Sequence, residues 1–163
     1  MFGLGGRVLV GSTLRLSLGG AYKNTVTSYS PIGYWRLGEP SGTTAVDETG
    51  TTNGTYVNTP TLGASSLITG EADTSATFVS TNSEHVIAVN QTAFNISHFS
   101  VSAVIQISAA PASVQEIISV ADSASSINTD KALRLRTDGK VEFYVFDGAQ
   151  QVAVSTDAIP LDE

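Results

Sequence analysis

The sequence predicts an all-β fold of short antiparallel strands, and three observations support this fold class. From Tyr34 onward, short apolar runs alternate with turn residues roughly every ten positions, a spacing typical of a sandwich or barrel. Charged residues make up only 14% of the chain, so Ser, Thr, Asn and Gly must cover most of the surface. No segment sustains a helical period for long. The 163 residues suffice for one domain with a terminal extension.

Residues 1–30 are predicted to form an N-terminal arm. Two short apolar runs, 7–10 and 14–18, flank a Gly-Ser-Thr turn and predict a hairpin. In the second run leucines alternate with Arg15 and Ser17, as in a half-buried strand. Because an isolated hairpin is marginal in water, this one must pack either on its own domain or on another chain. Both possibilities are open at this point.

The end of the arm, residues 22–29, is predicted to form one or two helical turns. The residue before Pro31 is disfavoured in helical conformation, so the helix must end there. A cleaved secretory signal is the alternative for the first part of the arm. Arg7 and Arg15 argue against it, because they interrupt the would-be apolar region instead of preceding it.

Residues 31–163 are predicted to form the folded domain. Strand-like runs with intervening turn residues are the basis for this prediction. The strands are expected over 34–37, 55–57, 76–79, 85–89, 99–107, 116–120, 132–136, 141–146 and 151–154. Further turns are expected at 122–126 and 147–148, the latter opening a second hairpin.

The clearest local element is a hairpin over 132–146. Asp138 and Gly139 form the pair favoured in a tight primed turn, in which both central residues have positive φ. The alternation of the flanking residues places Leu133 on an apolar face of the first strand and Phe143 on an apolar face of the second.

Several segments resemble laminin-G-like, concanavalin-A-like jelly-roll domains. Ser-Pro-Ile-Gly-Tyr-Trp-Arg-Leu-Gly-Glu-Pro-Ser-Gly at 30–42, followed by Ala-Val-Asp-Glu-Thr-Gly-Thr-Thr-Asn-Gly-Thr-Tyr at 45–56, is similar to the opening of these domains. Later similarities lie at 76–89, at Phe-Ser-Val-Ser-Ala-Val-Ile-Gln-Ile-Ser in 99–108, and in the hairpin at 134–143. The resemblance implies an antiparallel jelly-roll β-sandwich over 31–163 with a binding or assembly role.

The resemblance also bears on context and completeness. Residues 21–31 are similar to the stretch that precedes such domains in bacteriophage tail and virion proteins. Family members continue beyond residue 161 with further strands, whereas the sequence stops at Glu163. We therefore expect either a fragment of a longer protein or a sandwich completed by a partner, because unpaired sheet edges favour association.

Composition excludes several kinds of partner and site. The net charge of −7 argues against nucleic acid, whose binders need a basic face to displace counterions. The absence of cysteine excludes disulfides and thiolate metal sites. No apolar run reaches the length of about 18 residues that a membrane span needs.

Calcium is the one cofactor for which the sequence offers candidate ligands. Asp47 and Asn53, with the backbone between them, supply the oxygen ligands that hard cations prefer. The resemblance adds that this loop can hold calcium in related domains. The alternative is that both side chains organise turns, with Gly50 and Gly54 providing positive φ.

The sequence predicts a protein that is not an enzyme. Glycoside hydrolases of this fold need carboxylates in a Glu-x-Asp-x-x-Glu pattern, and the nearest approach, Glu71-Ala-Asp73, ends in Ala76 where the second Glu is required. His85 and His98 lack the neighbouring ligands of a zinc site.

These observations lead to a ranked set of functions. The first is a non-enzymatic structural or adhesion module of a virion, in a phage tail or on a capsid exterior, that assembles with other virion subunits or itself through the arm and an open sheet edge. It could also bind host surface glycans. The second is a secreted or cell-surface bacterial lectin-like domain that binds carbohydrate, with Trp35 and Tyr34 as a stacking platform or, alternatively, as core residues. A glycoside hydrolase ranks last.

Overall fold

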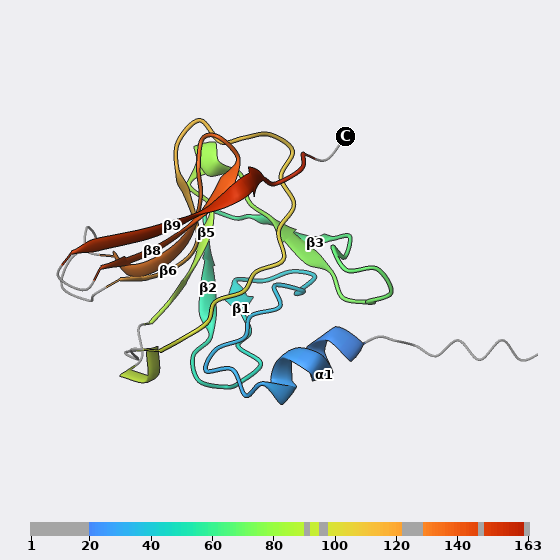
Figure 1. Cartoon of the computed structure of the whole chain (residues 1–163). Helices are drawn as coiled ribbons and strands as arrows, with labels where there is room; N and C mark the ends of the chain where they lie inside the picture. Colours follow the sequence, from blue (N-terminus) through green and yellow to red (C-terminus); the bar gives the residue numbers. More distant parts are fainter. Residues whose placement is uncertain (1–19, 90–91, 95–97, 122–128, 147–148, 162–163) are drawn as a thin grey trace, which may run out of the picture.

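The computed structural model describes residues 20–89, 92–94, 98–121, 129–146 and 149–161, which are mostly β with one short α-helix (Figure 1). The strands form three separate antiparallel sheets, none of them closed, and a jelly-roll sandwich is not shown by the described strands. The predicted antiparallel β class is confirmed for this part of the chain.

The sheets contain three, two and four strands in chain order. The first has the order β1 (Thr44–Ala45), β2 (Gly54–Val57) and β5 (His85–Ala88). The second pairs β3 (Thr61–Ala64) with β4 (Ser75–Thr77). The third has the order β6 (Gln115–Ala121), β7 (Thr129–Leu135), β8 (Lys140–Phe146) and β9 (Gln150–Ala158). Two 3₁₀ turns, η1 (Ser80–Asn82) and η2 (Thr92–Phe94), flank β5.

The predicted helix at the end of the arm is confirmed as α1 (Ala21–Ser28). The chain enters it through Gly20, which has a φ of 99°, and leaves it through Ser30, which has a φ of 51°, directly before Pro31. No residue of α1 is buried, and the helix lies at the end of the molecule away from the four-stranded sheet (Figure 1). Within the described residues no helix has the length and apolar character of a membrane span.

The three-stranded sheet contains the tightest packing in the first half of the chain. Ala45 of β1 and Tyr56 of β2 are both buried. Gly54 lies so close to β5 that a Cβ atom there would collide with the side chain of Val86. Glycine at this position therefore allows β2 and β5 to pair with Thr55 opposite Ile87.

The strand predicted over 34–37 is wrong. Trp35 makes only one antiparallel bridge, to Asp47. Leu37 has a φ of 57°, which lies outside the extended region, so the backbone leaves the ladder after a single bridge. The segment is held by side-chain contacts instead, which are described with the candidate site.

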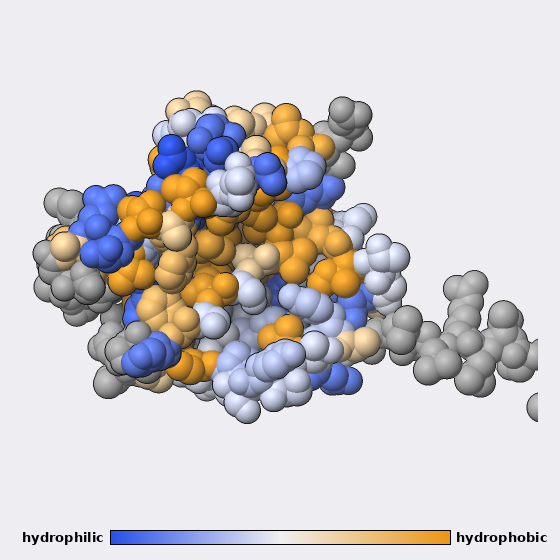
Figure 2. All heavy atoms as spheres, viewed as in Figure 1, coloured by the Kyte–Doolittle hydropathy of each residue, from blue (hydrophilic) through white to orange (hydrophobic). Residues whose placement is uncertain are grey.

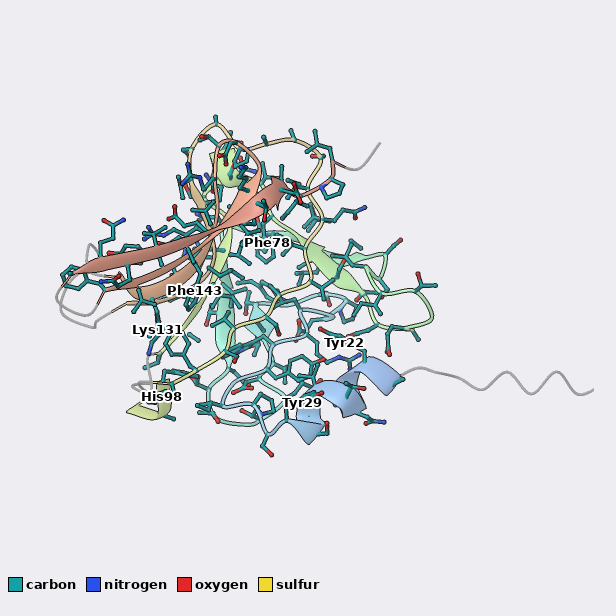
Figure 3. The ribbon with its side chains drawn as sticks, in the orientation of Figure 1. Tyr22, Tyr29, Phe78, His98, Lys131 and Phe143 are labelled. Carbon is teal, nitrogen blue, oxygen red and sulfur yellow. The ribbon has the colours of Figure 1, made fainter. Side chains whose placement is uncertain are left out.

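The inner face of the four-stranded sheet is apolar, as the hairpin pattern predicted. Leu133 on β7 is opposite Phe143 on β8. The ring of Phe99 packs on Phe143 with 5.7 Å between the ring centroids. The ammonium of Lys131 lies 4.6 Å from the centre of the Phe99 ring, and Figure 3 shows Lys131 and Phe143 on the side of the sheet that faces His98. This face therefore packs on the chain that follows His98.

The opposite face of the same sheet is held by charges. Arg134 on β7 lies opposite Glu142 on β8 and Glu116 on β6, with nitrogen–oxygen distances of 3.7 and 3.4 Å. Its guanidinium lies 4.1 Å from the centre of the Tyr144 ring. Pairs of this kind on a half-exposed face contribute little individually, about 0–1 kcal/mol each.

The hairpin between β7 and β8 forms, but its turn differs from the predicted one. The backbone N–H of Arg136 donates to Lys140 O (2.8 Å), and that of Gly139 donates to Arg136 O (3.0 Å), so three residues form the loop. Gly139 alone has a positive φ, of 76°. A primed turn with positive φ at Asp138 is therefore wrong, because Asp138 instead accepts the N–H of Lys140 (3.2 Å) inside a wider loop closed by a left-handed glycine.

The strand predicted over 99–107 is also wrong. Half-buried and exposed residues alternate along most of it, as expected of a strand. However, Ile107 makes only an isolated parallel bridge to Leu161, and residues 99–106 make no backbone hydrogen bond within the described structure. A strand needs a neighbour, and no described strand pairs with this segment.

The remaining strand predictions have mixed outcomes. The strands expected over 55–57, 85–89, 116–120, 132–136, 141–146 and 151–154 are confirmed as β2, β5, β6, β7, β8 and β9. The strand expected over 76–79 is shorter, as β4, and β1 and β3 were not predicted. The arm hairpin over 7–18, the loop at 122–126 and the turn at 147–148 lie outside the described residues.

The buried apolar core of the described residues is small. It consists of Ala45, Tyr56, Ala132 and Leu135, and no large side chain is completely buried. Figure 2 shows apolar residues gathered across the middle of the visible face. The exposed large apolar residues include Val104, Val114, Phe146, Val152 and Val154. Much of the apolar surface of the fold is therefore uncovered.

Candidate functional site: the Asp47 loop and the contacts of α1

Asp47 lies at the centre of the loop between β1 and β2, and its side chain organises that loop. Asp47 is only 3% exposed. Its carboxylate accepts hydrogen bonds from the backbone N–H groups of Tyr34 (2.9 Å), Thr49 (3.0 Å), Thr51 (3.1 Å) and Thr52 (3.0 Å). The hydroxyl of Thr49 donates to it at 2.8 Å. One buried carboxylate thus joins the 34–35 segment to the whole loop.

Asn53 and Trp35 complete this loop. The Oδ1 atom of Asn53 accepts the backbone N–H of Asp47 at 3.0 Å. The indole Nε1 of Trp35 donates to the carbonyl oxygen of Thr52 at 3.1 Å, and its ring lies 6.3 Å from that of Phe94. The Trp35 side chain is therefore half-buried and anchored by its polar atom.

The two residues predicted as calcium ligands are thus close together, and both are engaged in hydrogen bonds to the chain. Both carboxylate oxygens of Asp47 receive N–H donors, and Oδ1 of Asn53 receives one. A cation would have to displace donors that hold the loop. Within the described residues no group of three or more His, Asp or Glu side chains is placed to hold a metal ion. Calcium at Asp47 and Asn53 stays a prediction.

The pKa of Asp47 reflects two opposing effects. Burial raises the pKa of its carboxyl, because it disfavours the charged form. The backbone hydrogen bonds from Tyr34, Thr52 and Thr49 favour the charged form, and the net result is a pKa below the usual value. The loop is therefore built around a carboxylate that is ionised at neutral pH.

A second polar pair, of buried Tyr56 and half-buried Glu39, was missed by sequence reasoning. The Tyr56 hydroxyl donates to Glu39 Oε2 at 2.6 Å, and Glu39 Oε1 accepts the N–H of Val46 at 2.8 Å. Burial, followed by this hydrogen bond, raises the pKa of Tyr56. The Glu39 carboxylate thus joins Tyr56 on β2 to Val46, the residue between β1 and Asp47. Glu39 lies in the Gly-Glu-Pro-Ser-Gly stretch, whose turn residues were the only available signal.

Glu71 holds the start of α1. Its two carboxylate oxygens accept the backbone N–H groups of Gly20 (2.8 Å) and Tyr22 (2.9 Å). Free N–H groups at a helix start need such acceptors, and the α1 sequence provides none of its own. These two hydrogen bonds, first that from Tyr22, hold the pKa of Glu71 below its usual value. A residue 49 positions away therefore caps the helix.

One ion pair reinforces the attachment of α1, and two pairs of Arg36 extend it into a network. Lys23 on α1 contacts Glu48 at 2.6 Å, and Arg36 contacts Glu48 at 3.7 Å and Asp73 at 2.6 Å. Gly38 lies so close to Asp73 that a Cβ atom there would collide with the carboxylate. Both carboxylates of the Glu71-Ala-Asp73 stretch, considered above for hydrolysis, thus make contacts within the chain.

The other candidate residues lie apart from the Asp47 loop. His85 is exposed on β5, with Nδ1 2.8 Å from Ser83 O, and His98 is exposed at the start of the 99–107 segment. A shallow hollow of about 270 Å³ lies beside Tyr56. It is lined by Pro40, Ser41, Gly42, Thr43, Tyr56, Thr59, Pro60 and Leu62.

Comparisons with known proteins return no match: no family model, no curated protein and no solved structure is similar to this chain. The site must therefore be interpreted from its own geometry.

Proposed function

We propose that the chain is a non-enzymatic structural and adhesion module of a virion, located in a phage tail or on a capsid exterior. In this proposal residues 31–163 form an incomplete jelly-roll sandwich of the laminin-G-like type. Residues 1–30 form the arm, and α1 fixes the direction in which the arm leaves the domain. The partners are other virion subunits or further copies of the chain, and host glycans are a second class of ligand.

The observation that carries the proposal is the free edge of the four-stranded sheet. β9 is the last strand in the order β6-β7-β8-β9, and all nine of its residues are exposed. Free edges expose backbone donors and acceptors that pair readily with another strand. Soluble monomers usually protect such edges with lysine, proline or a bulge. β9 contains neither lysine nor proline, and the irregular register of its pairing with β8 is confined to the stretch between Val154 and Ala158, so residues 150–154 form the unprotected part of the edge.

The exposed apolar side chains beside this edge also support the proposal. Val152 and Val154 on β9 are 45% and 43% exposed, and Phe146 at the end of β8 is 46% exposed. A strand added to β9 would satisfy its backbone and cover part of this surface. In an assembly, a partner would cover both the unpaired backbone of β9 and these apolar side chains, whereas in a free monomer both stay exposed to water.

Sedimentation of the purified chain over a range of concentrations tests the proposal. We expect self-association, and we expect Val152→Lys with Val154→Lys to weaken it at least tenfold, because lysines on an edge oppose strand addition. The matched control is Ser41→Lys with Thr81→Lys, which adds the same charge at exposed positions away from β9. A monomer at all concentrations, or equal weakening by both double variants, would contradict assembly through β9.

A carbohydrate-binding lectin-like domain, secreted or on a cell surface, is the second candidate. The hollow beside Tyr56 favours it, since Tyr56, Pro40 and Pro60 offer apolar faces next to the hydroxyls of Ser41, Thr43 and Thr59. A glycan array probed with and without calcium tests this candidate, and binding lost in Thr59→Trp would support it. No binding under either condition would leave assembly as the only proposed role. Hydrolysis of β-glucan that Glu71→Gln abolishes would overturn both non-enzymatic candidates.

A further inference from the structure

The segment 99–106 has the side-chain pattern of a strand and an unpaired backbone. Phe99, Val101 and Ile105 are half-buried, while Ser100, Ser102, Ala103, Val104 and Gln106 are exposed. No backbone hydrogen bond of these residues is present in the described structure. Backbone N–H and C=O groups of a packed segment are nearly always paired. The position beside this segment is therefore suited to one more strand.

The β3–β4 connection borders both the attachment point of the arm and one end of this segment. Glu71 binds the N–H of Gly20, and Glu71 belongs to the same β3–β4 connection as Ser66 and Leu67. Ser66 and Leu67 line a hollow together with residues 104–106. The β3–β4 connection thus links Gly20, where the arm begins, to the 104–106 end of the unpaired segment. Five residues in extended conformation span up to about 17 Å, enough to pair with about five of the eight residues of the segment.

The sequence of the arm fits this position. In residues 14–18, Leu14, Leu16 and Leu18 share one face of a strand, and Arg15 and Ser17 share the other. The leucines would continue the half-buried row of the 99–106 segment, and Arg15 and Ser17 would continue its exposed row.

We propose that residues 14–18 add as a β-strand to the segment 99–106 of the same molecule. The short connection through Gly20 decides for the same molecule over a second copy. A segment tethered next to its binding position has an effective concentration of about a millimolar or more, which favours the intramolecular pairing over exchange between subunits. Residues 1–13 would then be the part of the arm available to other subunits. The pairing holds whether or not the chain belongs to a virion.

Engineered disulfides test the pairing directly, since the chain contains no cysteine. Ser17→Cys is combined, one at a time, with Ser102→Cys, Val104→Cys or Gln106→Cys, all on the exposed row. On mild oxidation we expect at least one pair to form an intramolecular disulfide in most molecules. Ser17→Cys with Thr81→Cys, an exposed position on η1, is the matched control and should not cross-link. Disulfide-linked dimers would show that a second copy is the occupant, and no cross-link in any pair would show that the arm does not bind there; either result overturns the proposal.

Hydrogen exchange of the full-length chain provides a second readout that needs no cross-link. We expect the amides of 99–106 to exchange about tenfold or more faster in the triple variant Leu14→Ser, Leu16→Ser, Leu18→Ser than in the unaltered chain. The control variant Arg15→Ser with Ser17→Ala changes only the outward row and should preserve the protection. Unprotected amides in the unaltered chain, or equal effects of the two variants, would contradict the proposal.

Discussion

The Asp47 loop and the segment 99–107 are both irregular, but they satisfy their polar groups in opposite ways. In the loop, one carboxylate accepts four backbone N–H groups, and Trp35 and Asn53 pair with backbone atoms as well. In 99–106, the backbone makes no hydrogen bond within the described structure. The first region is complete by itself, whereas the second needs a partner. The difference shows that irregular backbone indicates an interaction surface only where its N–H and C=O groups have no hydrogen-bond partner.

The largest expected effect concerns the Asp47 loop. Asp47→Ala should lower the free energy of unfolding by about 3 kcal/mol, because four part-buried N–H donors lose their shared acceptor. Chemical denaturation followed by the fluorescence of Trp35, the only tryptophan, measures this loss. Asp157→Ala removes the same charge from the exposed β9 strand and should change the free energy by less than about 0.5 kcal/mol. A loss below about 1 kcal/mol for Asp47→Ala would show that the loop does not depend on its carboxylate.

Disrupting the packing between the 99–107 segment and the four-stranded sheet should lower the free energy of unfolding by less than the loss of Asp47 does. A fully buried Phe→Ala substitution costs about 3–5 kcal/mol, but Phe143 is only half-buried, so we expect about 2 kcal/mol from Phe143→Ala. Denaturation followed by circular dichroism measures it. Phe146→Ala, at an exposed position, serves as the control and should cost less than about 1 kcal/mol. A loss of about 4 kcal/mol at Phe143 would mean that the sheet is covered more completely than its exposure indicates.

Acid should act on the Asp47 loop in a defined direction. The pKa of Asp47 is lower in the folded chain than in the unfolded one, where it is about 3.9. The carboxylate therefore contributes stability above that pH, and the contribution is lost as the pH falls further, through the folded value. Denaturation midpoints from about pH 7 to pH 2, read from Trp35 fluorescence, should fall most steeply in this acid range. In Asp47→Asn the slope should be shallower, and an unchanged slope would assign the acid sensitivity to other carboxylates.

The smallest effect is expected at α1. Glu71→Gln replaces one accepting oxygen with an amide NH₂ group, so one of the N–H groups of Gly20 and Tyr22 loses its acceptor. Amide exchange over 20–24 should accelerate, while global stability should stay almost unchanged because α1 buries no residue. Glu84→Gln, at the turn before β5, is the control. Unchanged exchange over 20–24 would show that Glu71 does not cap the helix.

The sequence predicted regular elements better than the contacts between them. Hairpin strands such as β7 and β8 have strict apolar alternation, and α1 is bounded by Pro31, so local pattern sufficed. The segments 34–37 and 99–107 have the same local pattern and form no strand. Pairing depends on a neighbour that lies elsewhere in the sequence, and in 34–37 the positive φ of Leu37 breaks the ladder.

The candidate site was predicted in part. Asp47 and Asn53 were identified as loop residues with oxygen ligands, and the structure brings them together. Their hydrogen bonds organise the turn, which was the alternative to calcium binding. The roles of Glu39 and Glu71 were not predicted. Glu71 accepts an N–H group 49 positions away, and Glu39 accepts one 7 positions away, and neither spacing follows a helix or strand period. A carboxylate that caps a helix 49 residues away leaves no periodic signal.

Hydrogen exchange at a low and a high protein concentration tests the proposed assembly through β9 most directly, with the Asp47 loop as a self-contained reference. We predict that amides of the Asp47 loop, 47–52, are protected equally at both concentrations, because their partners lie within the chain. Amides of β9, in contrast, should become about tenfold better protected at high concentration, as its free edge pairs with another molecule. If β9 exchanges at the same rate at both concentrations, self-assembly through the free edge of β9 is wrong.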